Sequence, residues 1–253
     1  MTMHLQVHFL PQPNTSTEVA GRTVVVIDIL RATTTMLHAL WSGAREVIPC
    51  LEVDEARNVA QQFDGTAILG GERGGKRIPG FTLGNSPAEY TPQTVGGKTI
   101  VMTTTNGTRA LQACRGAARV LIGAFVNFSR VVAELERVEK VSLLCAGTNG
   151  RVTREDVLFA GAVVHALRRN GIENNNVDDE AELAAAAWES SVGNVTAWDP
   201  LRSALTASRG GRNLVELGFD SDIVLSAQVD ARPILGELVL DQWRIVSGPD
   251  ART

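Results

Sequence analysis

The chain has 253 residues, a formal net charge of −4 and 5% aromatic residues. This balance argues against nucleic acid as a partner, because phosphate backbones require a basic surface and bases stack on aromatic side chains. No apolar run approaches the roughly 18 residues that a membrane span requires, so we expect no membrane partner.

The cysteines and the N-terminal stretch bear on the cellular compartment of the protein. Three cysteines occur without a CxxC spacing, which argues against a disulfide framework or zinc knuckle and favours a reducing compartment. The N-terminal stretch has no basic region and contains Pro11 and Pro13, so we predict no signal peptide. We therefore expect a cytoplasmic protein, and we further expect a homo-oligomer.

Six short apolar, β-branched runs are typical of buried strands, and their continuity indicates a sheet covered on both faces. The predicted strands are residues 23–29, 46–50, 66–69, 99–102, 119–122 and 141–145. Helical patterns follow at residues 34–41, 55–63 (with Asp54 as N-cap), 108–115, 129–137 and 154–169. Strands that alternate with helices predict an α/β fold with three layers, α/β/α, around a largely parallel or mixed central sheet.

The last third of the chain differs from this pattern. Residues 1–172 form the predicted α/β core that carries the site, and residues 173–253 form a helical and hairpin region. That region is either a smaller lobe or a cap on the same sheet. "DPLRSALTASRGGRNLVELGF" predicts two short helices divided by Gly210 and Gly211, and "ARPILGELVLDQWRIV" predicts a closing hairpin or edge strand.

Three segments share one plan: an apolar strand, a turn of small polar residues, and a helix. They are "VVVIDILRATTTMLHAL", "TIVMTTTNGTRALQAC" and "VSLLCAGTNGRVTREDVLFAG". Ligands of open α/β sheets bind beyond the carboxyl ends of the strands, so we expect the three turns at one edge of the sheet. Helix N-termini with Thr, Asn and Gly turns suit phosphate, sulfate or carboxylate. Simple capping and turn formation is the alternative for each turn, but three similar turns favour an anion site.

Asp28 ends the run "VVVID", and Arg31 follows three residues later. The two side chains could form a structural ion pair at the strand end. An Asp at the end of a central parallel strand also suits metal ligation or acid–base chemistry. The second Asp of a DxD phosphatase signature is absent, so an aspartyl-phosphate intermediate is not supported.

"AILGGERGGKRIPGFTLGNSP" nearly matches a P-loop, but Arg77 replaces the Ser or Thr that would bind Mg²⁺ and no helix start follows. This excludes ATP binding there. A long glycine-rich loop remains, with Glu72 and Arg73 at its start and Asn85 and Ser86 at its end. Such loops often bind ligands or close over them, although a solvated loop whose charges have no function is the alternative.

Glu155 and Asp156 lie in the first turn of the helix after the third small-residue turn. The helix dipole alone favours carboxylates there, which is the structural alternative for each. A carboxylate beside an anion site would repel the anion. A Mg²⁺ ion between them resolves this conflict, as in many phosphoryl-transfer sites.

Four motifs in this order resemble the 2-phosphosulfolactate phosphatase family (ComB-like): "IDILRATTT", "GGERGGKRIPGFTLGNSP", "TTTNGTRAL" and "CAGTNGRVTREDVLFAG". The resemblance implies a Mg²⁺-dependent hydrolase that converts (R)-2-phospho-3-sulfolactate, a small anionic phospho-acid, into 3-sulfolactate and phosphate. It also implies a step of coenzyme M biosynthesis.

The resemblance and the residue chemistry together suggest roles. Carboxylates would hold Mg²⁺ or activate water, Arg31 and the second turn would hold the phosphoryl group, and the glycine-rich loop would meet the carboxylate or sulfonate. The predicted catalytic residues are Asp28, Arg31, Glu72, Asn106 and Asp156, and the predicted metal ligands are Asp28, Glu72, Glu155 and Asp156. The predicted substrate-binding residues are Arg31, Thr33, Thr34, Arg73, Asn85, Ser86, Thr104, Thr105, Asn106, Gly107, Thr108, Gly147, Thr148 and Asn149.

Two rival functions remain open at this point. One is a phosphatase for another small phospho-acid or a phosphosugar. The other is a non-catalytic anion-binding or regulatory protein. For the second turn we expect Asn106→Ala or Gly107→Val to weaken ligand binding with little loss of fold.

Overall fold

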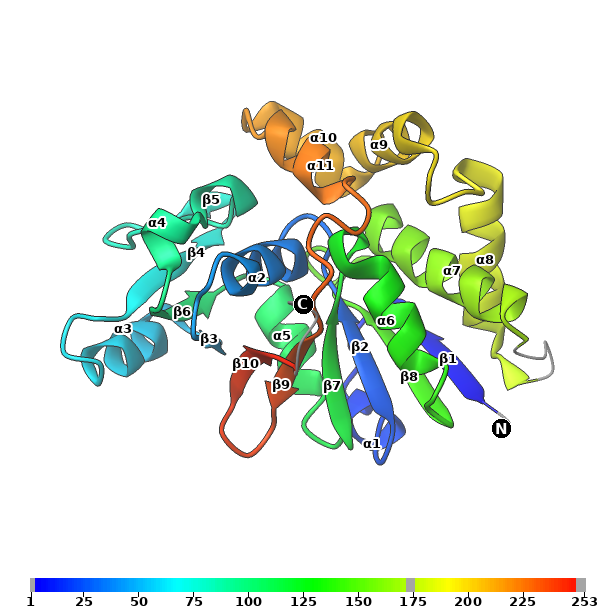
Figure 1. Ribbon diagram of the computed structural model, residues 1–253, viewed down its shortest axis with the longest axis horizontal. Coiled ribbons are helices and arrows are strands. Elements are labelled where there is room, and N and C mark those ends of the chain that lie inside the picture. The colour runs from blue at the N-terminus through cyan, green and yellow to red at the C-terminus, as the bar shows by residue number, and fades with distance from the viewer. Residues whose placement is uncertain (1–2, 172–175, 249–253) are drawn as a thin grey trace.

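A single mixed sheet of ten strands organises the part of the chain that the computed structural model describes, residues 3–171 and 176–248. The strands are β1 (His4–His8), β2 (Thr23–Ile27), β3 (Glu46–Pro49), β4 (Ile68–Arg73), β5 (Lys76–Arg77), β6 (Thr99–Thr103), β7 (Arg119–Gly123), β8 (Lys140–Cys145), β9 (Gly236–Val239) and β10 (Arg244–Ser247). Their order across the sheet is β1-β8-β2-β7-β9-β10-β3-β6-β4-β5 (Figure 1).

The sheet consists of two parallel groups of strands. β1, β8, β2 and β7 run parallel to one another, and so do β3, β6 and β4. The hairpin β9–β10 lies between the groups and is antiparallel to its neighbours on both sides. Three successive antiparallel pairings therefore make the two groups run in opposite directions.

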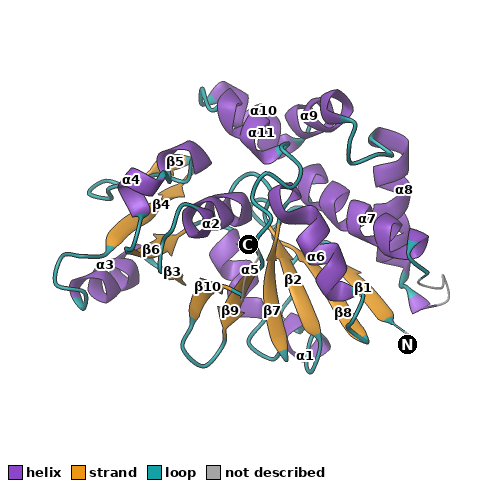
Figure 2. Ribbon diagram, in the orientation of Figure 1, coloured by secondary structure: helices purple, strands orange, loops and turns teal. Residues whose placement is uncertain are grey.

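Helices lie on both faces of this sheet (Figure 2). They are α1 (Thr15–Glu18), α2 (Ala32–Trp41), α3 (Val53–Gln61), α4 (Pro92–Val95), α5 (Gly107–Ala113), α6 (Phe128–Leu135), α7 (Arg154–Arg169), α8 (Asp179–Ser191), α9 (Trp198–Thr206), α10 (Arg209–Glu216) and α11 (Asp220–Ser226), with 3-10 helices η1 (Pro87–Glu89) and η2 (Phe125–Asn127). A Cβ placed on Gly123 of β7 would lie 2.9 Å from Phe159 of α7. Ile122, the residue before Gly123 in β7, faces the opposite side of the sheet. On that side its partner Gly236 of β9 lies against Leu37 of α2.

These observations confirm the predicted α/β fold and its three layers. All six predicted strands and the five predicted helices of the core are present, with ends shifted by a few residues. β1 was not predicted, because its partly exposed edge position gives an alternating rather than a continuous apolar pattern. β4 extends beyond its predicted end through Arg73 and pairs with β5, so part of the glycine-rich loop is a hairpin.

One predicted helix cap was wrong. Helix α3 begins at Val53, with Glu52 rather than Asp54 as its N-cap. The carboxylate of Glu55 accepts hydrogen bonds from the backbone N–H groups of Leu51 and Glu52, which fixes the earlier start. Asp54 instead forms an exposed ion pair with Arg57.

Two expectations for the C-terminal region change. The break between α9 and α10 falls at Ala207 and Ser208, and the Ser208 hydroxyl caps α10 by accepting from the Gly211 N–H. Gly210 and Gly211 therefore lie inside α10 and do not divide two helices. The predicted hairpin is confirmed as β9–β10, but it lies in the middle of the sheet rather than at its edge.

The predicted boundary at residue 172 lies outside the described residues, so the division into two regions stays a prediction. β9 and β10 nevertheless belong to the same sheet as the N-terminal strands. Figure 1 shows α9 in gold and α10 and α11 in orange, gathered above the middle of that sheet. In the described part of the chain no helix is long and apolar enough to cross a bilayer. The expected cytoplasmic location and homo-oligomer stay predictions.

Candidate active site

The two parallel groups of strands meet at a cavity of about 370 Å³. Its wall includes residues that follow the carboxyl ends of β2, β6 and β8, residues of β4 and the β4–β5 turn, and one side of α10. The three turns thus share one cavity, although they do not follow three strands of one parallel group. The second turn, after β6, approaches from strands that run in the opposite direction.

Asp28 follows β2 directly and lies on the cavity wall, although it is buried. Its Oδ1 accepts a hydrogen bond from the Ala32 N–H at 3.2 Å, whereas no hydrogen bond between described residues uses its Oδ2. Burial raises the pKa of Asp28 to about 7, with smaller upward contributions from the charges of Glu72 and Glu155 and opposition from the Ala32 hydrogen bond. Asp28 can therefore exchange a proton near neutral pH.

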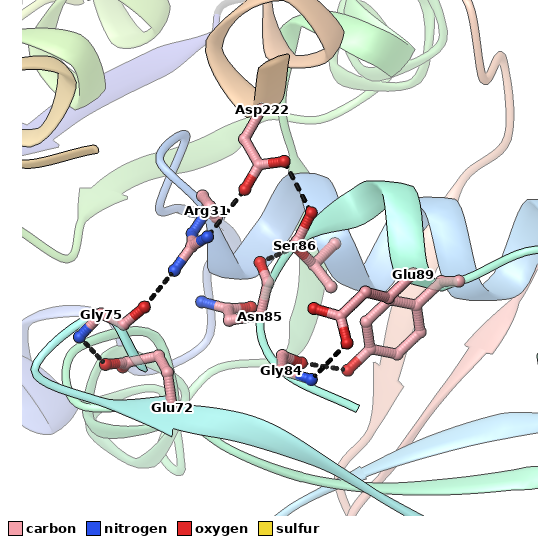
Figure 3. Close-up of polar contacts among 10 residues, drawn as sticks. Arg31, Glu72, Gly75, Gly84, Asn85, Ser86, Glu89 and Asp222 are labelled. Atoms are coloured by element: carbon pink, nitrogen blue, oxygen red, sulfur yellow. Dashed lines mark hydrogen bonds and ion pairs between the residues drawn. The ribbon is translucent and has the colours of Figure 1, made fainter. Parts of the chain in front are cut away.

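Arg31 also lies on the wall, but the alternative that it pairs with Asp28 is wrong. Its Nη1 donates to Asp222 of α11 at 2.7 Å, and its Nη2 donates to the Gly75 carbonyl at 2.8 Å (Figure 3). The guanidinium also stacks over the ring of Phe219 at 4.4 Å. The carboxylate of Asp222, which does not line the cavity, therefore already balances the charge of Arg31.

Thr33 and Thr34 shape the first turn and do not line the cavity. The Thr33 hydroxyl accepts from the Asp28 N–H and donates to the Asp28 carbonyl. The Thr34 hydroxyl donates to the Ile29 carbonyl. Both hydroxyls are hydrogen-bonded to backbone groups and lie away from the cavity wall. Their position therefore does not support the predicted contact with substrate.

The second turn places Thr104, Thr105 and Asn106 on the cavity wall. The Thr105 hydroxyl oxygen is buried and has no hydrogen-bond partner among the described residues. Thr108 instead closes the turn, since its hydroxyl donates to the Thr104 carbonyl. A Cβ on Gly107 would lie 2.5 Å from Ala32 Cβ and 3.0 Å from Asp28 Oδ2, so we now expect Gly107→Val to disturb packing, contrary to the sequence-based expectation.

The third turn contributes Thr148 and Asn149 to the wall, but it does not contribute its carboxylates. Asp156 accepts from the Ile29 N–H at 2.9 Å and from the Gly147 N–H at 3.0 Å, which ties the first and third turns together. Burial first, and then the charges of Asp28 and Glu155, raise the pKa of Asp156 well above its ordinary value. Asp156 is thus a bridge between strand ends and lies off the cavity wall.

Glu155 is 2% exposed and lies against the first turn of α10. A Cβ on Gly210 would collide with its carboxylate, which explains why glycine occupies that position. Burial raises the pKa of Glu155 above its ordinary value. Like Asp156, it is absent from the cavity lining.

Some residues of the glycine-rich loop line the cavity, and others lie away from it. Glu72 lies on the wall, where its Oε1 accepts from the Thr105 N–H at 2.7 Å and its Oε2 accepts from the Gly75 N–H at 2.8 Å. Asn85 also lies on the wall, and its Oδ1 is buried without a partner among the described residues. Arg73, by contrast, donates to the Leu51 carbonyl and the Thr103 hydroxyl and does not reach the cavity.

Sequence reasoning missed two parts of the site. One is α10, which contributes Gly210, Asn213, Leu214 and Glu216 to the wall. The other is Asp222, a buried carboxylate bonded to Arg31 and to the Ser86 hydroxyl. Nothing in the local sequence "FDSD" distinguishes Asp220 from Asp222. The two residues differ in the side of α11 on which they lie, so that Asp220 is exposed and Asp222 is buried.

The described wall of the cavity carries more carboxylates than positively charged side chains. The charged residues of its described wall are Asp28, Glu72 and Glu216 against Arg31, which is itself paired with Asp222. Such a wall would repel an anion unless a cation or proton is present. No three His, Cys, Asp or Glu side chains among residues 3–171 and 176–248 converge on one metal position. Mg²⁺, however, often uses only one or two protein carboxylates together with water and substrate phosphate, which Asp28 and Glu72 could supply.

Comparison with known proteins identifies relatives over most of the chain. The family model described as 2-phosphosulpholactate phosphatase matches residues 9–240. A protein of Symbiobacterium thermophilum named as a probable 2-phosphosulfolactate phosphatase is 40% identical over 232 residues, which covers 88% of this chain and 96% of the relative. Proteins with the same name from Thermotoga maritima and Caldanaerobacter subterraneus are 42% and 38% identical and cover 80% and 86% of this chain, and 82% and 88% of those relatives. The chain therefore belongs to the 2-phosphosulpholactate phosphatase family.

Proposed function

We propose that this protein is a Mg²⁺-dependent phosphatase that hydrolyses (R)-2-phospho-3-sulfolactate to 3-sulfolactate and phosphate. Family membership supports the reaction class, and the names of the relatives support the substrate. The observation that carries the proposal is the cavity wall itself. It brings Asp28 and Glu72 together with Arg31 and the donor-rich turn from Thr104 to Asn106.

Asp28 and Glu72 would hold the ion, which when bound would offset the negative charge of the phosphoryl group. Both Glu72 oxygens accept one backbone N–H, and each carboxylate oxygen has a second lone pair for a further partner. Asp28 Oδ2 makes no hydrogen bond within the described chain. These two side chains therefore keep free acceptor capacity on the wall.

Arg31 and the second turn would bind the phosphoryl oxygens. The backbone after β6 and the Thr105 hydroxyl supply neutral donors, and Arg31 supplies the remaining N–H groups of a fixed guanidinium. Hydrolysis adds water to phosphorus and breaks the ester P–O bond, and the leaving oxygen gains a proton. The attacking water supplies that proton, so the reaction balances without a proton from the chain.

The test is phosphate release from a substrate panel with and without EDTA. The panel contains (R)-2-phospho-3-sulfolactate, 2-phospholactate, 3-phosphoglycerate and a phosphosugar. We expect the highest kcat/KM for the sulfonated substrate, loss of turnover in EDTA and recovery with excess Mg²⁺.

Other outcomes would decide between the alternatives. Preference for another member of the panel would keep the phosphatase and change the substrate. Turnover that persists in EDTA would contradict the metal. Thermal stabilisation by sulfolactate or phosphate without turnover of any substrate would contradict catalysis and favour an anion-binding protein.

A further inference from the structure

The side chain of Asp222 is completely buried and joins two parts of the site. Its Oδ2 accepts from Arg31 Nη1 at 2.7 Å, and its Oδ1 accepts from the Ser86 hydroxyl at 2.6 Å. Figure 3 shows Asp222 on one side of the Arg31 guanidinium and Gly75 on the other. We infer that Asp222 is a positioning residue that fixes Arg31 in its phosphoryl-binding orientation, an inference that rests on the proposed function.

Arg31 needs such a partner because the cavity contains competing carboxylates. Asp28 lies three residues away on the same turn, and Glu72 lies on the same wall. An unpaired, buried guanidinium would be attracted to either of them and would fill the space meant for the ligand.

The geometry also leaves Arg31 with free donors. Of the five N–H groups of a guanidinium, one is used by Asp222 and one by the Gly75 carbonyl. Phe219 covers one face of the guanidinium, at 4.4 Å from its ring centroid. The planar group is thus held on two edges and one face, and the remaining N–H groups can bind anionic oxygens without a change of rotamer.

Ser86 supports the carboxylate rather than the substrate. Its hydroxyl is bonded to Asp222, and Ser86 does not line the cavity, although its neighbour Asn85 does. Ser86 therefore acts on the site through Asp222, and its position does not support the predicted direct contact with substrate. Four separate segments, at residues 31, 75, 86 and 222, meet in this one network.

The test compares Asp222→Asn and Ser86→Ala with the matched control Asp220→Asn, an exposed carboxylate on the same helix. We expect Asp222→Asn to lower kcat/KM on the order of 100-fold, because misplacement of a binding group by about 1 Å costs that much. Ser86→Ala should give a smaller loss in the same direction, and Asp220→Asn should give none. Inorganic phosphate should bind more weakly to Asp222→Asn in calorimetric titrations.

A double-mutant cycle separates positioning from general stability. In an Arg31→Lys background the Asp222→Asn change should cost little further activity, because the guanidinium that it orients is gone. Equal losses in both backgrounds, or unchanged phosphate binding by Asp222→Asn, would overturn the inference. If Asp222→Asn does not fold, the same cycle with Ser86→Ala decides. Phosphate binding tests Asp222 even if no substrate is turned over, so failure of the proposed function stays distinguishable.

Discussion

Asp28 and Asp156 are two buried aspartates beside the carboxyl ends of the neighbouring strands β2 and β8, Asp28 directly after β2 and Asp156 in the first turn of α7. Burial raises the pKa of both, and the charge of Asp28 raises the pKa of Asp156 further. Their surroundings nevertheless differ. Asp28 lies on the cavity wall with one oxygen that no backbone group of the described residues uses. Asp156 lies behind the wall, and both of its oxygens accept backbone N–H groups from the turns on either side.

The difference shows how one residue type serves chemistry and architecture within one site. A carboxylate with unused acceptor capacity on a cavity can bind a cation or move a proton. A carboxylate whose lone pairs are used by two chain segments holds those segments together. Variants at the two positions should therefore separate activity from stability.

The largest expected effect is on the activity of Asp28→Asn. We expect kcat/KM to fall by roughly 1000-fold, because the change removes a charged cation ligand from the cavity. The fold should survive, since the amide keeps the shape and removes a buried charge that Glu72 and Glu155 oppose. Phosphate-release kinetics and urea unfolding of the same preparation measure the two quantities.

The matched change Asp28→Glu keeps the charge and moves it by one methylene. Activity of Asp28→Asn close to that of the wild type would break the comparison, because Asp28 would then be as structural as Asp156.

The next effect is a loss of stability in Asp156→Asn. An amide nitrogen would face the N–H of either Ile29 or Gly147, and one buried donor would lose its partner at a cost of about 1 to 3 kcal/mol. Relief of repulsion from Asp28 and Glu155 would offset part of that cost. Urea unfolding should show the loss, while activity per folded molecule should remain close to that of the wild type. A stable but inactive Asp156→Asn would instead place Asp156 in the chemistry.

The sequence was sufficient for the fold class and for the location of the cavity at strand ends. Apolar runs and turn residues are local signals, so β2, β6 and β8 and the turns after them could be predicted. The central position of β9–β10 could not, because it depends on pairing between strands more than 100 residues apart. The separate roles of Asp28 and Asp156, and of Asp220 and Asp222, depend on which way each side chain points, and a single turn of sequence does not encode that direction.

The pKa of Asp28 gives a smaller effect with a definite sign. Its pKa is about 7 in the folded protein against an ordinary value of 3.8. Between these values the folded state keeps a proton that the unfolded state has lost, so stability should fall as the pH rises through that range and then level off. Thermal unfolding in EDTA at pH 5 and pH 8 should show a larger decrease for the wild type than for Asp28→Asn. Equal decreases would mean that Asp156 and Glu155 alone carry the pH dependence.

Asn106→Ala should have the smallest effect on activity, because Asn106 is uncharged and only connects the second turn to the third turn. Its Oδ1 accepts from the Asn149 N–H at 3.0 Å, and both residues lie on the cavity wall. Loss of one partly exposed hydrogen bond of about 1 kcal/mol should raise KM roughly fivefold by loosening the third turn, while kcat changes little. Steady-state kinetics of Asn106→Ala and of the exposed control Asn58→Ala on α3 measure this. A large fall in kcat would instead mean that the second and third turns act directly on the reacting group, and that Asp28 does not carry the chemistry of this wall alone.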